Sequence, residues 1–98
     1  MDLKKIKEKF NLPISAGDGK TIETPIIIDH NENNYVRLEY FIISKILEIN
    51  DNVSYERSNQ KLLKFNDRTI DNLKFKITDK KNSTVKYVEF YFDITKVY

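Results

Sequence analysis

Cysteine is absent from this sequence, which excludes disulfide bonds, zinc sites built from thiolates and catalysis by a thiol. Histidine occurs once, as His30, and glycine and proline occur twice each. Long apolar runs are absent too, since none approaches the roughly 20 residues of a transmembrane helix. The first residues carry several lysines but no apolar core like that of a signal peptide. We therefore expect a cytoplasmic protein that makes no contact with a membrane.

The length and composition predict one domain spanning residues 1–98. A chain of this size buries roughly 60–70% of its unfolded surface, which is enough for one modest core but not for a deep cleft as well. Charged residues make up 33% of the chain and leave a net charge of +2. Residues 58–98 are mildly basic, with 9 basic and 5 acidic side chains, and a solvated surface rich in lysine is the simplest interpretation.

Apolar and polar side chains alternate along residues 70–78 and again along residues 85–95. Because successive side chains of a strand point to opposite faces, this alternation predicts a long antiparallel β-hairpin. One face is apolar and consists of Leu73, Phe75, Ile77, Val88, Phe90, Phe92 and Ile94. The other face, called the outer face below, consists of Asn72, Lys74, Lys76, Tyr87, Glu89, Tyr91 and Asp93.

The register of the hairpin is predicted by pairing the apolar rows of its two strands. Ile77 is expected opposite Val88, which leaves Lys81–Thr84 as a four-residue loop. A slip by one residue would turn one apolar row toward water, so burial opposes it. The same register places Phe75 opposite Phe90, Leu73 opposite Phe92, Lys76 opposite Glu89, and Lys74 opposite Tyr91.

Residues 35–49 have the spacing of an amphipathic helix, with Glu39, Lys45 and Glu48 as its polar positions. Residues 35–43 also alternate and are rich in β-branched and aromatic side chains, so a strand is an alternative there. The length of the segment favours the helix. Asn31, Asn33 and Asn34 offer N-cap side chains, and Asn50-Asp51-Asn52 ends the segment. The apolar stripe consists of Tyr35, Leu38, Ile42, Ile46 and Ile49, widened by Phe41 and Ile43.

The N-terminal part of the chain predicts a short helix, a loop and a short strand. Asp2–Phe10 has the apolar spacing of a helix, and Pro13 ends it. Residues 15–24 contain both glycines of the chain, which predicts a turn with positive φ. Pro25–Asp29 is expected to form a strand in which proline suits an edge or the first position. An uncapped edge of this kind can pair with a second copy, so both a monomer and a homodimer stay open.

Val53–Phe65 is expected to form one strand, or two, because its alternation changes phase near Ser58-Asn59, as at a bulge. Asn66-Asp67-Arg68 is the expected turn into the hairpin. The predicted fold class is α+β. We expect an antiparallel three- to four-stranded meander, with one main helix packed on its apolar face and a short N-terminal helix.

Patterns of catalytic or ligand-binding residues are weak in this sequence. Gly19-Lys20-Thr21 resembles the end of a phosphate-binding loop, but Ile14 stands where the first glycine of that motif would be. Asp29, His30 and Glu32 could suggest a metal site, yet they are better explained as a polar connection between a strand and a helix. We predict no metal, no cofactor and no enzymatic activity, with a small enzyme of unknown reaction as an alternative.

The outer face of the hairpin is the best candidate for a partner-binding surface. Tyrosine is enriched at protein interfaces, and charges of both signs flank the tyrosines here. We therefore predict a non-enzymatic module that binds a protein. Nucleic-acid binding is an alternative function, although acidic groups in the same patch disfavour it. Another alternative is that the N-terminal segment covers the outer face. The predicted contact residues are Lys74, Lys76, Tyr87, Glu89, Tyr91 and Asp93.

Several short motifs occur together in this chain, namely Gly17-Asp18-Gly19 with Glu23 and Pro25–Asp29, Glu39-Tyr40, Gln60, Asp71, and Tyr91-Phe92-Asp93-Ile94-Thr95. In this combination the chain resembles a family of small uncharacterised bacterial α+β proteins. Some small α+β proteins of this kind resemble immunity proteins that are paired with bacterial toxins. The resemblance implies an immunity-like inhibitor that masks a cognate toxin without chemistry of its own.

Overall fold

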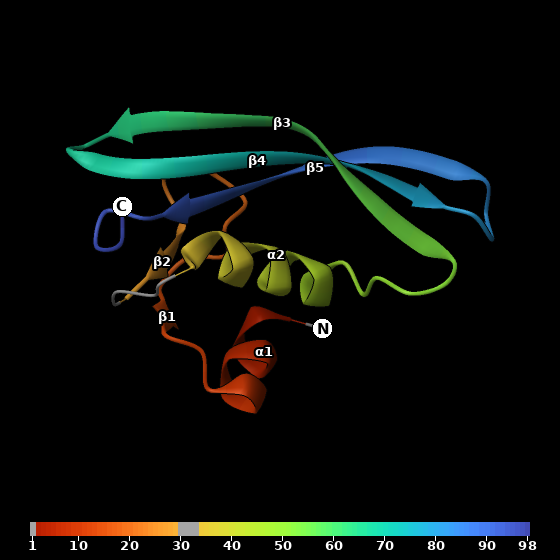
Figure 1. Ribbon diagram of the computed structural model, residues 1–98, viewed down its shortest axis with the longest axis horizontal. Helices are drawn as coiled ribbons and strands as arrows, with labels where there is room; N and C mark the ends of the chain where they lie inside the picture. The colour runs from red at the N-terminus through yellow and green to blue at the C-terminus, as the bar shows by residue number, and fades with distance from the viewer. Residues whose placement is uncertain (1, 30–33) are drawn as a thin grey trace.

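The computed structural model describes residues 2–29 and 34–98, which form two helices and five strands. In chain order these are α1 (Leu3–Phe10), β1 (Ile14–Ser15), β2 (Ile26–Ile28), α2 (Tyr35–Ile46), β3 (Val53–Phe65), β4 (Arg68–Asp79) and β5 (Thr84–Asp93). The strands form one mixed, mostly antiparallel sheet in the order β1-β2-β5-β4-β3, so the protein is α+β. Figure 1 shows α2 against one face of the sheet and α1 on the far side of α2.

The meander of β3, β4 and β5 confirms the main expectation from the sequence. β3 is one strand, and its pairing with β4 shifts between Arg57 and Asn59, at the bulge that the change of phase predicted. Phe65 pairs with Arg68, so only Asn66 and Asp67 form the turn, with φ values of 49° and 62°. Two positive φ values give a tight hairpin turn whose twist matches that of the flanking strands, and Asn and Asp tolerate this conformation.

The predicted register of β4 and β5 is wrong by two residues. Val88 lies opposite Phe75 and Phe90 lies opposite Leu73, where the prediction placed Val88 opposite Ile77 and Phe90 opposite Phe75. A shift of two residues keeps every side chain on its predicted face, so the hydrophobic pattern could not distinguish the two registers. On the outer face the observed pairs are Lys74 with Glu89, Lys76 with Tyr87, and Asn72 with Tyr91.

The chemistry of the loop explains which register forms. The Asp79 carboxylate accepts hydrogen bonds from the backbone N–H groups of Lys81 and Asn82 at 3.0 and 3.2 Å, and from the Asn82 side chain at 2.8 Å. These bonds close the turn immediately after Asp79, which pairs with Thr84. The loop is therefore Lys80–Ser83 and not Lys81–Thr84.

Two strands at the other side of the sheet depart from the prediction. β1 was not expected, and it pairs antiparallel with β2. β2 in turn pairs parallel with β5, with Ile26 opposite Phe92. Pro25 directly precedes β2, but the strand lies inside the sheet, so the expectation of an uncapped edge at residues 25–29 is wrong. The edges of this sheet are β1 and β3.

The helix expected at residues 35–49 is α2, so the strand alternative for residues 35–43 is wrong. Asn34 is its N-cap, and its side chain accepts a hydrogen bond from the Arg37 backbone N–H at 3.1 Å. The helix ends at Ile46, three residues earlier than expected, and Glu48 then takes a φ of 53°. Asn31 and Asn33 lie outside the described residues.

The short helix α1 packs on α2. Asp2 caps its first turn by accepting from the Lys5 backbone N–H at 2.9 Å, and Asn11 ends it in the left-handed conformation, two residues before Pro13. The Phe10 ring meets the Phe41 ring of α2 edge-on, with centroids 5.0 Å apart. These contacts hold α1 in place, as a helix of this length needs in water.

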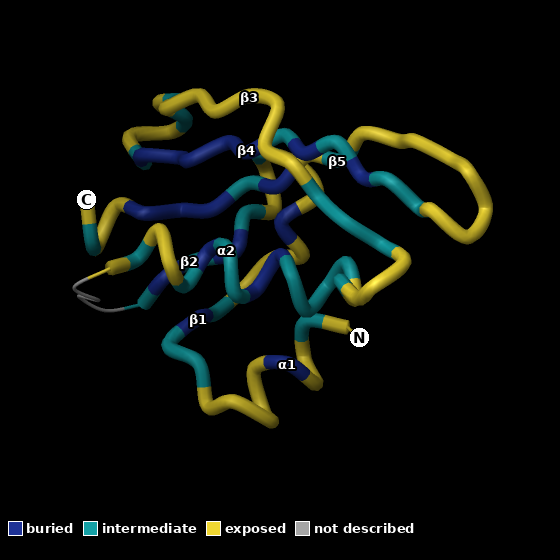
Figure 2. The backbone as a smooth tube through the Cα atoms, turned by 45° about the vertical axis from the view of Figure 1, so that its right-hand side comes forward, coloured by how far each residue is buried: buried dark blue, intermediate teal, exposed yellow. Residues whose placement is uncertain are grey.

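The core lies between the sheet and α2, as predicted. The Phe75 ring is at its centre, in contact with the rings of Tyr40, Tyr55 and Phe90. Figure 2 shows the buried backbone in the middle of the sheet and along part of α2, whereas the end of the β4–β5 hairpin is exposed. The core side chains include Ile26, Ile28, Ile42, Ile43, Leu73, Phe75, Ile77, Phe90, Phe92 and Ile94.

Candidate functional site

The hairpin brings five of the six predicted contact residues together on the outer face, which points away from α2. Tyr87 and Glu89 are exposed, and Lys74, Lys76 and Tyr91 are half-buried. The Tyr87 side chain, 57% exposed, lies under the Lys74 ammonium group, which is 5.4 Å from the ring centroid. The lysine therefore holds an exposed aromatic ring in place on this face.

Tyr91 is where the N-terminal segment meets the outer face. The carbonyl of Gly19 accepts a hydrogen bond from the Tyr91 backbone N–H at 2.8 Å. Gly19 has a φ of 75°, and a Cβ there would lie 2.8 Å from Ile26 Cδ1, so this close approach requires glycine. Burial, followed by the carboxylates of Glu89 and Glu23, raises the pKa of Tyr91. The N-terminal segment thus reaches Tyr91 and leaves Tyr87 open.

Asp93, the sixth predicted contact residue, is buried with only 1% of its surface exposed. Its carboxylate is paired with Arg68 and accepts from the backbone N–H and hydroxyl of Thr95 at 3.0 and 2.6 Å. Burial alone would raise the pKa of Asp93, but the bonds from Thr95 and Arg68 outweigh it and lower the pKa. Asp93 therefore stabilises the end of β5 and is not available to a partner in this structure.

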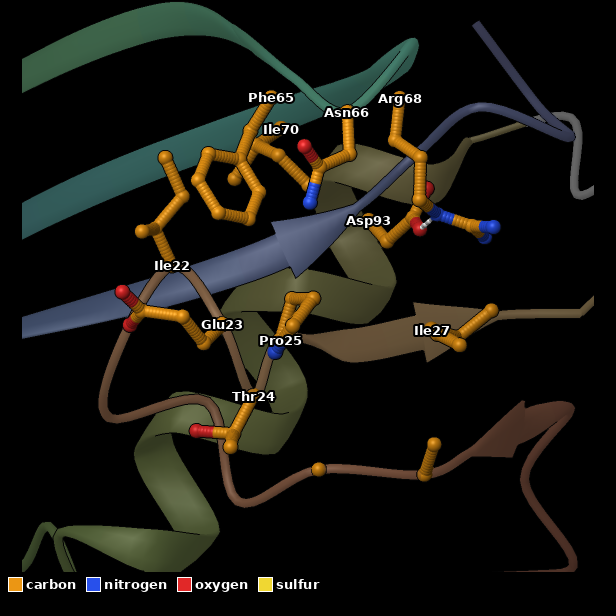
Figure 3. A pocket seen from close by; sticks show the side chains of 12 residues that line it. Ile22, Glu23, Thr24, Pro25, Ile27, Phe65, Asn66, Arg68, Ile70 and Asp93 are labelled. Atoms are coloured by element: carbon orange, nitrogen blue, oxygen red, sulfur yellow. Dashed lines mark hydrogen bonds and ion pairs between the residues drawn. The ribbon is translucent and has the colours of Figure 1, made fainter.

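A hollow of about 330 Å³ lies beside Asp93. Figure 3 shows its two walls, the loop that carries Ile22 and Pro25 and the β3–β4 turn that carries Phe65 and Asn66. Glu23 and Arg68 add one charge of each sign to the lining. The sequence did not reveal this hollow, because its walls come from segments about 40 residues apart in the chain that only the tertiary fold brings together. Its apolar lining includes Ile22, Pro25, Ile27, Phe65 and Ile70.

A second cluster, on the other face of the sheet, joins α2 to β4 through two carboxyl groups. Glu39 and Asp71 are both buried, with 0% and 1% of their surface exposed. Burial, followed by a hydrogen bond with Asp71 and the charge of that residue, raises the pKa of Glu39 to about 10. Glu39 is therefore protonated at neutral pH and lies beside the Asp71 carboxyl group.

Gln60 of β3 extends this cluster toward a cation. Its Nε2 donates to Asp71 Oδ1 at 3.0 Å, and its Oε1 accepts from Arg57 Nη1 at 2.8 Å. The two bonds together set the orientation of the Gln60 amide. Arg57 thus reaches the carboxyl pair only through an intervening amide.

The carboxyl pair adjoins a second hollow, of about 320 Å³, next to the C-terminal turn. Burial, followed by the charges of Glu39 and Asp71, raises the pKa of Tyr35, so this tyrosine stays neutral at physiological pH. The lining residues are Tyr35, Gln60, Leu62, Asp71, Ile94 and Tyr98.

Glu39 was expected at a polar helix position, and its burial corrects that expectation. A signal for it exists in the sequence, because Glu39 follows Tyr35 by four residues and precedes Ile42 by three. These spacings place it inside the apolar stripe of the helix, where a carboxyl group needs a buried partner. The identity of that partner, Asp71, could not be read from local spacing.

The metal hypothesis involved Asp29, His30 and Glu32, of which His30 and Glu32 lie outside the described residues. Asp29 accepts a hydrogen bond from the Ser15 hydroxyl at 2.6 Å and lies 3.6 Å from the Lys96 ammonium group. Within residues 2–29 and 34–98, histidine and carboxyl side chains form no group of three or more that could hold a metal ion. Helices in the same ranges are all too short or too polar to span a membrane.

No family model matches this chain, and no curated protein or solved structure is significantly similar to it. Some residues of the motifs named in the sequence analysis lie close to one another in the structure. Glu39, Gln60 and Asp71 form the buried carboxyl cluster, whereas Asp93 and Thr95 are bonded to each other at the end of β5.

Proposed function

We propose that this chain is a non-enzymatic protein-binding module that contacts its partner through the outer face of β4 and β5. The observation that carries the proposal is the exposed ring of Tyr87, which lies on a sheet face bearing lysines and a glutamate. Large aromatic side chains held in place on a surface are frequent anchors of protein interfaces. Tyr87 is the anchor, and Lys74, Lys76 and Glu89 are the charged rim.

The hollow beside Asp93 supports the same surface. It borders the outer face at the end of β5, and its apolar lining offers space for an apolar side chain of the partner. Such a side chain would gain roughly 25 cal/mol for each Å² of apolar surface removed from water. The outer face thus has two contact points. Tyr87 projects toward the partner, and the hollow accepts a side chain of the partner.

Charge favours an acidic partner. The end of the hairpin, residues 80–87, is exposed and extends beyond α2 (Figures 1 and 2). Lys80 and Lys81 in this segment join Lys74 and Lys76, whereas Asp79 and Glu89 are the acidic residues nearby in the sequence. A basic surface of this kind speeds encounter with an acidic partner and makes the rate dependent on salt.

The immunity-like role rests on the resemblance of the motifs. It predicts a partner that is toxic when it is expressed alone and harmless when this chain is expressed with it. The inhibitor would act by covering the partner's surface, as a binding module without chemistry of its own.

The experiment is a pull-down from the native host with the full chain as bait, followed by measurement of the dissociation constant of the captured protein. Tyr87→Ala should weaken binding by at least tenfold, because loss of an anchor removes more than about 1.4 kcal/mol. Val36→Ala is the control, since Val36 is also an exposed apolar side chain but lies on α2. Unchanged binding by Tyr87→Ala and by Tyr91→Ala would exclude the outer face as the interface.

Nucleic-acid binding is the second candidate, and the same lysines favour it. Phosphate contacts by several lysines would give binding that weakens steeply with salt. A gel-shift titration with single- and double-stranded oligonucleotides at two salt concentrations separates the candidates. A salt-dependent shift that Lys74→Gln and Lys80→Gln abolish would favour nucleic acid over an acidic protein.

A further inference from the structure

Among residues 2–29 and 34–98, no cation directly contacts the buried carboxyl pair of Glu39 and Asp71. Glu39 holds its proton at neutral pH, because burial and Asp71 raise its pKa to about 10. Arg68 is instead paired with Asp93, and Lys96 lies 3.6 Å from Asp29. Arg57 is separated from Asp71 by the Gln60 amide, and Lys64, on the same face of β3, donates to Thr69. Two adjacent buried carboxyl groups without a contacting cation are costly and need an explanation.

The hydrogen bonds of the pair are also incomplete. Both Glu39 oxygens and Asp71 Oδ2 are buried, and they receive no donor from other described residues. A proton shared between the two carboxyl groups would satisfy at most one oxygen of each. The second Glu39 oxygen is left without a donor. The cluster therefore has room for both a positive charge and further hydrogen-bond donors.

The adjoining hollow has the lining that an organic cation needs. Asp71 provides a carboxylate, and Tyr35 and Tyr98 provide aromatic rings that attract cations. Leu62 and Ile94 provide apolar surface for an alkyl chain. A hollow that combines one carboxyl group with aromatic and apolar side chains suits a small amphipathic ligand.

We propose that this hollow is a binding site for an alkylammonium or alkylguanidinium group, which Asp71 at its wall holds by charge and hydrogen bonds, with Glu39 as the buried neighbour of Asp71. The group can belong to a free amine or to a lysine or arginine side chain of another protein, since both present the same chemistry. On binding, the cation replaces the shared proton, which leaves Glu39 for the solvent. The site is on the helix side of the sheet and is independent of the outer face.

Because binding of the cation releases a proton, the affinity should depend on pH, and this dependence tests the proposal. Each bound cation releases up to one proton, so the apparent affinity should rise by up to about tenfold for each pH unit below the pKa of the pair. Tyr35 does not imitate this, because burial raises its pKa and keeps the ring hydroxyl neutral.

The experiment is an NMR titration of the full chain with n-butylammonium, n-butylguanidinium and, as the uncharged control, butan-1-ol. The side-chain amide of Gln60 is the reporter, because it donates to Asp71. Titrations at about pH 6 and about pH 9 should give saturable shifts for the two cations, with tighter binding at the higher pH. Butanol should give none. Titrations with N-acetyl-lysine methylamide and with putrescine then distinguish the two sources of the cation. Tighter binding of the lysine derivative indicates a protein side chain, and tighter binding of putrescine indicates a free amine.

Two variants test the residues. Glu39→Gln should bind the cations with no pH dependence, because the exchangeable proton is gone, and Asp71→Asn should abolish binding. Asp51→Asn, at an exposed carboxylate in a loop, is the matched control. Equal shifts with butanol and butylammonium, or binding of the wild type that does not change with pH, would overturn the proposal even if a variant failed to fold. The carboxyl pair would then be a structural link between α2 and β4 only.

Discussion

Replacement of Glu39 by glutamine should make the protein more stable at neutral pH. Glutamine has nearly the same volume and can donate a hydrogen bond from its amide to Asp71, as the protonated carboxyl does. It carries no ionisable proton, so the unfolded chain no longer gains free energy by releasing one. The substitution therefore preserves the buried contact and removes the penalty of keeping a carboxylic acid neutral.

The magnitude follows from the pKa of Glu39, which burial and Asp71 raise from 4.5 to about 10 on folding. Between these values the folded state holds a proton that the unfolded state has lost, so the free energy of unfolding falls as pH rises. The decrease is about 1.4 kcal/mol per pH unit, and it amounts to about 3 kcal/mol at pH 7. This contribution to stability is fully present below about pH 4 and is lost as pH rises toward 10.

Urea denaturation of the wild type and Glu39→Gln at several pH values measures the difference. The two free energies of unfolding should agree near about pH 4 and diverge as pH rises, with the variant about 3 kcal/mol more stable at pH 7. Glu89→Gln, at an exposed position, is the control and should show no such divergence. If Glu39→Gln were less stable than the wild type at neutral pH, or if its pH profile paralleled the wild type's, Glu39 would not be a buried neutral acid.

Three further substitutions test the packing. Phe75→Ala should lower the free energy of unfolding by about 3–5 kcal/mol in chemical denaturation, because it empties the centre of the core; a loss below 1 kcal/mol would contradict the described packing. Gly19→Ala should destabilise by more than about 1 kcal/mol, since it combines a positive φ with a clash against Ile26; an unchanged melting temperature would place the loop elsewhere. Arg68→Ala should cost about 1–3 kcal/mol at pH 7, because it removes the partner of buried Asp93. The pKa of Asp93 is lowered on folding, so its stabilising contribution is lost as pH falls, and the Arg68→Ala defect should shrink in acid.

The sequence by itself determined which side chains share a face. Alternation with a period of two separated the apolar row of β4 and β5 from the outer face, and the change of phase near Ser58-Asn59 located the bulge in β3. The apolar stripe of the helix and the N-cap residue Asn34 likewise located α2. These features are local, because each depends on the spacing of neighbouring residues within one element.

Tertiary structure alone decided how the strands are aligned and which distant strands pair. The β4–β5 register could be shifted by two residues without moving a side chain to the other face, and the hydrogen bonds of Asp79 selected one alignment. The parallel pairing of β2 with β5 joins segments about 65 residues apart, for which local spacing carries no signal. The state of Glu39 depends on the same kind of contact, since the desolvation of a carboxyl group is set by everything that surrounds it, including Asp71 from a distant strand.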